Sequence, residues 1–105
     1  MIIVDVNPGV CGLRTHIECR VNEDYQAIVT VESECKQVQR FGESLDGITA
    51  FGEVGNPICE TCVYRAASEC RLHAACPVPA ATIKGIEAAA GLALPADVTI
   101  SLRKG

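Results

Sequence analysis

Seven cysteines in a chain of 105 residues are the side chains most able to do chemistry in this sequence. In a reducing compartment such a density indicates metal binding or thiol chemistry, and an odd number excludes complete internal pairing. Three of them, Cys11, Cys35 and Cys76, stand where one expected element ends and another begins. Because side chains at such junctions can converge in space, we predict that these three thiols form one metal or iron–sulfur site.

The sequence around each of the three thiols favours negative charge on sulfur. Cys11 lies between Gly9 and Gly12, whose backbones adopt unusual angles and let N–H groups approach a ligand. Cys35 is expected in the first turn of one helix and Cys76 at the start of another, where free N–H groups and the helix dipole stabilise a thiolate. A tight turn at Cys11 and simple packing at Cys35 are the competing interpretations.

A second group of candidate residues falls on one stripe of a helix that Asn56-Pro57 is expected to open: Cys59, Cys62, Cys70 and His73. The stripe is too long for one site, because Cys62 and Cys70 would stand about 12 Å apart along the helix axis. Cys59-x-x-Cys62 is a candidate redox dithiol or auxiliary metal pair, and a buried face of small residues explains the stripe equally well. His73, three residues before Cys76, is the better candidate ligand of the two histidines.

Strand patterns occupy the first third of the chain and its end. Ile2–Val6 predicts a short strand buried on both faces, and Leu13–Val21 alternates cleanly as a half-buried strand with Cys19 in the core. Tyr25–Glu32 is β-branched and predicts the returning strand of a hairpin. Val98–Leu102 alternates again and predicts a last strand that could add to the sheet.

Helical patterns fill the middle of the chain. Ser33 offers an N-cap to a helix whose apolar stripe runs from Val38 to Ile48, and 49–55 is expected to be a loop. A further helix is expected to begin at Cys76 and to end at Gly91 as C-cap. Together these elements predict one α+β domain over residues 1–105. Its mainly antiparallel three- to four-stranded sheet has helices packed on one face.

Composition excludes several classes of function. The net charge is −4, the basic residues are scattered and there is no Trp, so nucleic-acid binding is not expected. No apolar run approaches the ~20 residues that span a bilayer. The first residues lack a basic region and predict a strand, so we expect a cytoplasmic protein. No Ser/His/Asp set, phosphate loop or paired-carboxylate signature favours a conventional hydrolase or kinase, although a thiol enzyme using Cys59 and Cys62, or a single activated cysteine, stays an alternative.

The order and spacing of the cysteines resemble the IscU/NifU-N family of iron–sulfur cluster scaffold proteins. The matching features are Cys11-Gly12 before a strand hairpin, Cys35 opening a helix, and His73 to Cys76 preceding the Ala/Ile-rich segment 80–90. The separations of 24 residues from Cys11 to Cys35 and 41 from Cys35 to Cys76 are close to that family's. The resemblance implies an IscU-like fold, an iron–sulfur cluster held by the three cysteines, and partners that donate or accept the cluster.

Three departures from that family limit what the resemblance implies. Leu13 stands where the scaffolds have an aspartate linked to cluster release, two alanines separate His73 from Cys76, and the chaperone-recognition segment is missing before His73. Ligation therefore carries over better than cluster transfer. The segments around Cys11 and Cys76 also resemble small uncharacterised proteins of methanogens and other anaerobes. The alternatives are a zinc module using Cys35, Cys76 and His73, and a thiol redox protein using Cys59 and Cys62.

Overall fold

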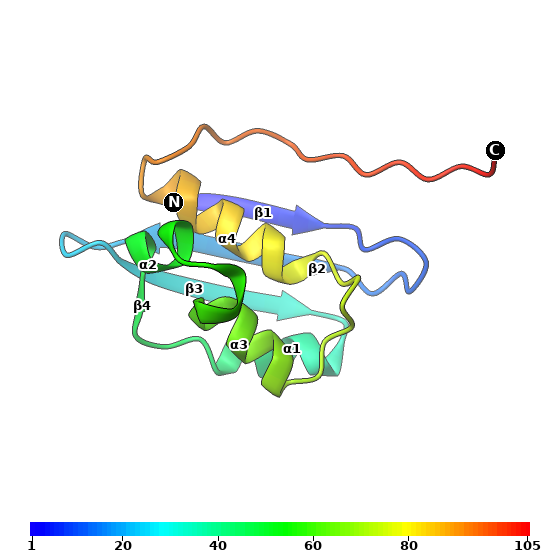
Figure 1. Ribbon diagram of the computed structural model, residues 1–105, viewed down its shortest axis with the longest axis horizontal. Helices are drawn as coiled ribbons and strands as arrows, with labels where there is room; N and C mark the ends of the chain where they lie inside the picture. The colour runs from blue at the N-terminus through cyan, green and yellow to red at the C-terminus, as the bar shows by residue number, and fades with distance from the viewer.

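The computed structural model describes residues 1–105 and consists of one antiparallel sheet and a set of short helices (Figure 1). The strands are β1 (Ile2–Val6), β2 (Thr15–Val21), β3 (Gln26–Ser33) and the short β4 (Ile48–Thr49). Their order in the sheet is β1-β2-β3-β4, and every neighbouring pair is antiparallel. The predicted fold class, α+β with a mainly antiparallel three- to four-stranded sheet, is confirmed, and the sheet has four strands.

The β2–β3 hairpin is the centre of the sheet. Ile17 lies opposite Val31 and Cys19 lies opposite Val29, so the apolar residues of both strands share one face. The turn is held by the Asn22 side chain, whose Oδ1 accepts hydrogen bonds from backbone N–H groups further along the turn. The expectation that Cys19 packs in the core is confirmed, since its side chain is completely buried.

The helical elements follow the hairpin and lie in the order α1, α2, η1, α3 and α4. Their bounds are α1 Lys36–Glu43, α2 Ala50–Gly55, the 3-10 turn η1 Ile58–Glu60, α3 Cys62–Glu69 and α4 Val78–Ala89. In Figure 1, α4 runs across β1 and β2 and α1 lies beside β3. None of the helices is long and apolar enough to cross a membrane.

Two glycines let the helices approach the sheet closely. A Cβ at Gly42 of α1 would lie 2.5 Å from the Cβ of Val31, and a Cβ at Gly85 of α4 would lie 2.7 Å from the Sγ of Cys19. Because Val31 and Cys19 belong to the same face, α1 and α4 cover that face together. The opposite face has no helix, and Ile3 on it is 56% exposed. The prediction that β1 is buried on both faces is therefore wrong.

The helix expected from Cys35 to Ile48 is shorter than its apolar stripe suggested. α1 ends at Glu43, and Ile48 is instead buried in β4, which pairs with the start of β3. Residues 50–55, expected as a loop, form α2. Ser33 is not the N-cap of α1. It is the last residue of β3, and its hydroxyl accepts the backbone N–H of Cys35, which occupies the N-cap position itself.

The single helix expected after Asn56-Pro57 is divided in two. Thr61 has extended backbone angles and separates η1 from α3. Its hydroxyl donates to the Ile58 carbonyl and accepts the Tyr64 N–H, so Thr61 caps α3. Cys59 and Cys62 therefore do not share one helical stripe with Cys70 and His73, because α3 ends at Glu69.

The end of α4 agrees with its sequence, whereas the segment that follows does not. Gly91 has a positive φ of 73°, and the N–H groups of Gly91 and Leu92 bond to the carbonyls of Ala88 and Glu87, as in a Schellman C-cap. Residues 98–102 lie in no strand and are exposed throughout. The predicted last strand is thus absent from the sheet of the single chain.

Candidate metal centre

The three predicted thiols belong to segments that meet at one end of the sheet. Figure 1 shows the β1–β2 loop, the start of α1 and the start of α4 at the end where β1 and β3 finish. Cys11 lies in that loop, Cys35 is the N-cap of α1, and Cys76 lies two residues before α4. Antiparallel topology explains the meeting, because the loop after β1 and the exit of β3 flank the same end of β2.

Hydrogen bonds fix the loop of Cys11 to the segment of Cys35. The backbone N–H of Arg14 donates to Oε1 of Glu34 at 2.7 Å, and the backbone N–H of Glu34 donates to the Arg14 carbonyl at 3.0 Å. This pairing continues the β2–β3 ladder by one step beyond Thr15 and Ser33. The residues just after Cys11 and just before Cys35 are therefore held side by side.

A second set of hydrogen bonds ties α1 to the segment of Cys76. The Gln37 side chain, in the first turn of α1, donates to the Arg71 carbonyl at 3.0 Å. The Cys76 N–H donates to the His73 carbonyl at 2.9 Å, which closes a turn just before α4. The segment 71–76 thus bridges the starts of α1 and α4.

The electrostatics of Cys76 show that the three thiols share one neighbourhood. Partial burial raises the pKa of the Cys76 thiol, and the negative charges of Cys35 and Cys11 raise it further. A hydrogen bond from the Val78 backbone N–H, in the first turn of α4, acts in the opposite direction and lowers this pKa. Cys76 therefore lies within electrostatic range of two thiols that are 41 and 65 residues before it in sequence.

The thiols are arranged more loosely than the donors of one bound ion. The structure contains no group of three or more His, Cys, Asp or Glu side chains that could hold a metal ion as it stands. Cys11 is exposed, while Cys35 and Cys76 are half-buried. The loop of Cys11 is held internally by the Gly12 N–H bonded to the Gly9 carbonyl, and both glycines have positive φ. The Cys11 side chain therefore has no part in the core.

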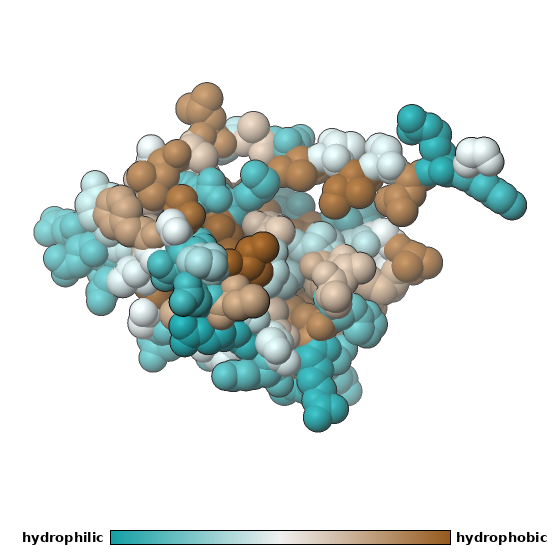
Figure 2. Space-filling view, in the orientation of Figure 1, coloured by the Kyte–Doolittle hydropathy of each residue, from teal (hydrophilic) through white to brown (hydrophobic).

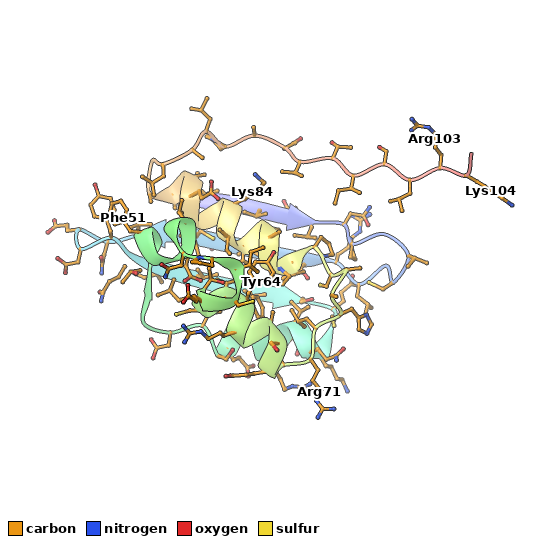
Figure 3. All side chains as sticks on the ribbon, viewed as in Figure 1. Phe51, Tyr64, Arg71, Lys84, Arg103 and Lys104 are labelled. Carbon is orange, nitrogen blue, oxygen red and sulfur yellow. The ribbon has the colours of Figure 1, made fainter.

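His73 and Cys70 lie beside this cluster with different environments. His73 is exposed, and with Cys76 it lines a hollow of about 250 Å³ bounded also by Tyr64, Leu72 and Pro79. Figure 3 shows Tyr64 between α3 and α4, where its ring forms one wall of the hollow. Cys70 is half-buried and packs against the core. His73 therefore shares a hollow with Cys76, whereas Cys70 packs against the core.

The pair Cys59 and Cys62 lies outside this cluster. Both thiols are exposed, Cys59 in η1 and Cys62 at the first position of α3. The start of α3 is occupied by the buried carboxylate of Glu53, which accepts the backbone N–H groups of Cys62 and Val63. The thiols whose charges act on Cys76 are those of Cys35 and Cys11.

Sequence reasoning found the cysteines but missed the groups that hold them in place. No distinctive motif marks these groups, which are the Glu34 side chain, the Gln37 side chain and the Val78 N–H. The two side chains bond to backbone groups that are distant in sequence, and the Val78 N–H is available because it lies in the first turn of a helix. Thr61 could have been found, because a threonine followed by an apolar run is a typical N-cap signal.

Fold and site together define a small α+β protein in which three cysteines gather at one end of an antiparallel sheet. The chain matches the family of unknown function DUF6951 over residues 2–102, and it belongs to that family. Neither a curated protein nor a solved structure matches the chain. The likeness to the IscU/NifU-N scaffolds therefore stays a prediction.

Proposed function

We propose that this protein binds an iron–sulfur cluster through Cys11, Cys35 and Cys76, as a scaffold or carrier. The observation that supports the proposal is that the segments of the three thiols meet at one end of the sheet, close enough that Cys35 and Cys11 both raise the pKa of Cys76. Once deprotonated for ligation, the three sulfurs repel one another unless a cation lies among them. A bound iron–sulfur unit supplies that positive charge and takes cysteine thiolates as its usual ligands.

The geometry accounts for both binding and release. Val78 offers a backbone N–H to the Cys76 sulfur, and such donors stabilise the anionic sulfurs of a cluster site. Cys11 sits on an exposed glycine-bracketed loop, so it can close onto a cluster and withdraw from it. His73 or Cys70, a partner protein or a small thiol would supply the fourth ligand. A cluster held at an exposed edge is suited to exchange with donor or acceptor proteins.

Because ligation removes the thiol proton, loading depends on pH. The raised pKa of Cys76 means that this residue is protonated in the metal-free protein at neutral pH, and binding must displace its proton. We therefore expect loading to become stronger as pH rises. A reducing cytoplasm that keeps thiols free is the compartment in which the protein would act.

The test is anaerobic reconstitution with iron and sulfide, followed by iron and sulfide analysis and visible absorption. The wild-type chain should take up both elements, and Cys11→Ser, Cys35→Ser and Cys76→Ser should each reduce cluster retention by at least about tenfold. The matched controls are Cys59→Ser and Cys62→Ser, which change exposed thiols outside the cluster and should load normally.

Each alternative outcome has a distinct meaning. Zinc without sulfide, lost in Cys35→Ser, Cys76→Ser and His73→Ala, would replace the proposal by a zinc module. A colourless protein whose Cys59 and Cys62 form a reversible disulfide would replace it by a thiol redox protein. Loss of cluster in the Cys59→Ser control but not in Cys11→Ser would also contradict the assignment of ligands.

A further inference from the structure

The C-terminal segment after α4 carries large apolar side chains that nothing in the chain covers. Ile100 is 74% exposed and Leu102 is 89% exposed, and Leu94 and Val98 are exposed as well. Figure 2 shows these hydrophobic side chains along the segment, standing out from the body of the molecule. Isolated exposed apolar residues are ordinary, but a continuous row of them indicates a contact surface.

The row has the period of a β-strand. Val98, Ile100 and Leu102 fall on one side of an extended chain, and Thr99 and Ser101 fall on the other. The family match extends to residue 102, so the segment is part of the family's domain. A strand of this kind is stable only when its backbone groups pair with another strand and its apolar side meets a core.

A free sheet edge of the same chain offers such a partner. β1 is the first strand of the sheet and pairs only with β2, so the backbone groups on its outer side are unpaired. Bare edges of this kind template the addition of another strand. The inward residues Ile2 and Val4 already pack against the core, and an added strand would extend that layer.

The single chain does not make this pairing. In Figure 1 the C-terminal segment runs from the end of α4 in the same general direction as β1, with no helix or strand of its own. The last backbone hydrogen bond along the chain is from the Leu92 N–H to the Glu87 carbonyl, and residues 93–105 make none. The Schellman cap at Gly91 ends α4, and the segment that follows it is joined to the sheet by no backbone hydrogen bond.

We propose that residues Val98–Leu102 of one copy add as a strand to the β1 edge of a second copy, and that the exchange is reciprocal. A symmetric exchange pairs both free edges and both apolar rows at once and closes on itself as a dimer. Charge favours it, because Arg103 and Lys104 follow the segment while β1 carries Asp5, whose carboxylate is 77% exposed although it also pairs with His16. Figure 3 shows both basic side chains at the far end of the segment.

The first experiment measures mass against concentration by sedimentation equilibrium, using the full chain, reduced and metal-free so that neither disulfides nor a shared cluster joins two copies. The wild-type chain should dimerise. Ile100→Lys should raise the dimer dissociation constant by at least about tenfold, because it removes one aliphatic side chain from each apolar row. Thr99→Lys adds the same charge on the other side of the strand and is the matched control, expected to dimerise nearly as well as wild type.

The second experiment identifies the contact directly. A mixture of isotope-labelled and unlabelled protein should give intermolecular nuclear Overhauser effects between residues 98–102 of one copy and β1 of the other. A chain that stays monomeric at all concentrations, a dimer unaffected by Ile100→Lys, or effects found only within one chain would each overturn the proposal. None of these results depends on whether the cysteines bind a cluster.

Discussion

The two groups of cysteines in this protein differ in how the fold uses them. Cys59 and Cys62 form the only Cys-x-x-Cys pair in the sequence, yet both are exposed on η1 and α3. Cys11, Cys35 and Cys76 have no local motif, yet their segments meet at the end of the sheet, where Cys35 and Cys11 raise the pKa of Cys76. Close spacing in sequence thus produced a surface pair, whereas topology produced a cluster. The comparison shows that cysteines at the junctions between elements, and not the closely spaced pair, lie on segments that the fold brings together.

The largest expected effect is a difference in thiol reactivity that ranks the cysteines by environment. Cys19 is fully buried and its pKa is raised to about 11 by burial, so it should be alkylated only when the protein opens. We expect it to react at least about a thousandfold more slowly than Cys59 and Cys62. Cys76 should react at an intermediate rate that still rises at pH values where an ordinary thiol has levelled off, because its pKa is raised. Mass-spectrometric mapping of iodoacetamide labelling measures all these rates, and equal rates for Cys19 and Cys59 would contradict the ranking.

The next effect separates the two groups by stability. Glu53→Gln removes the buried carboxylate that accepts the N–H groups of Cys62 and Val63, and it leaves an amide N–H₂ facing a donor. The loss should be about 2 kcal/mol in the free energy of unfolding, measured with urea. Glu60→Gln changes an exposed carboxylate and is the control, expected to stay within about 0.5 kcal/mol. Iron uptake should be unchanged in both variants, and its loss in Glu53→Gln would link the two groups.

A smaller effect should act on the helix that carries Cys76. A Cβ at Gly85 would lie 2.7 Å from the Cys19 Sγ and 2.8 Å from Cγ2 of Val4, so Gly85→Ala must push α4 away from the sheet. The free-energy cost of overpacking exceeds the gain from the higher helix propensity of alanine. The net loss should be about 1 kcal/mol in the free energy of unfolding. Gly55→Ala has open space around the new methyl group and serves as control. Cluster retention should weaken in Gly85→Ala alone, because only this variant moves the start of α4.

The smallest effect concerns His16, which belongs to neither group and lies on the open face of the sheet. Hydrogen bonds to Asp5 and Glu18, at 2.7 and 3.1 Å, raise the pKa of His16 above its ordinary value of 6.5. Protonated His16 therefore stabilises the folded state below about pH 6.5, and this contribution is lost as pH rises through the folded pKa. NMR titration should show the raised pKa, and Asp5→Asn should lower it. Thiol reactivity should not change in this variant, and a change would show that the open face communicates with the cysteine cluster.

Local patterns predicted those elements whose own side chains decide their structure. The alternation of Thr15 to Val21, the hairpin at Asn22 and the C-cap at Gly91 all appear as expected, because strand period, turn chemistry and positive φ are properties of a few neighbouring residues. The errors fall where a distant partner intervened. Ile48 fits a helical stripe but is used in β4, since pairing with the start of β3 buries it.

The same division holds for the candidate site. Sequence identified Cys11, Cys35 and Cys76 as residues at junctions, and it did not reveal that Arg14 pairs with Glu34 or that Gln37 reaches the Arg71 carbonyl. These contacts join residues 20 and 34 positions apart, respectively. No local pattern encodes them.

Sequence alone determined which residues have the chemistry to bind a metal and which segments favour strand or helix, because side-chain type and periodicity are written in the chain itself. Tertiary structure decided that three of seven thiols share one neighbourhood, that one face of the sheet stays open, and that the last apolar row finds no partner in its own chain. The physical reason is that convergence depends on how strands pair and helices pack. Those choices minimise the free energy of the whole molecule, to which each segment contributes only a part.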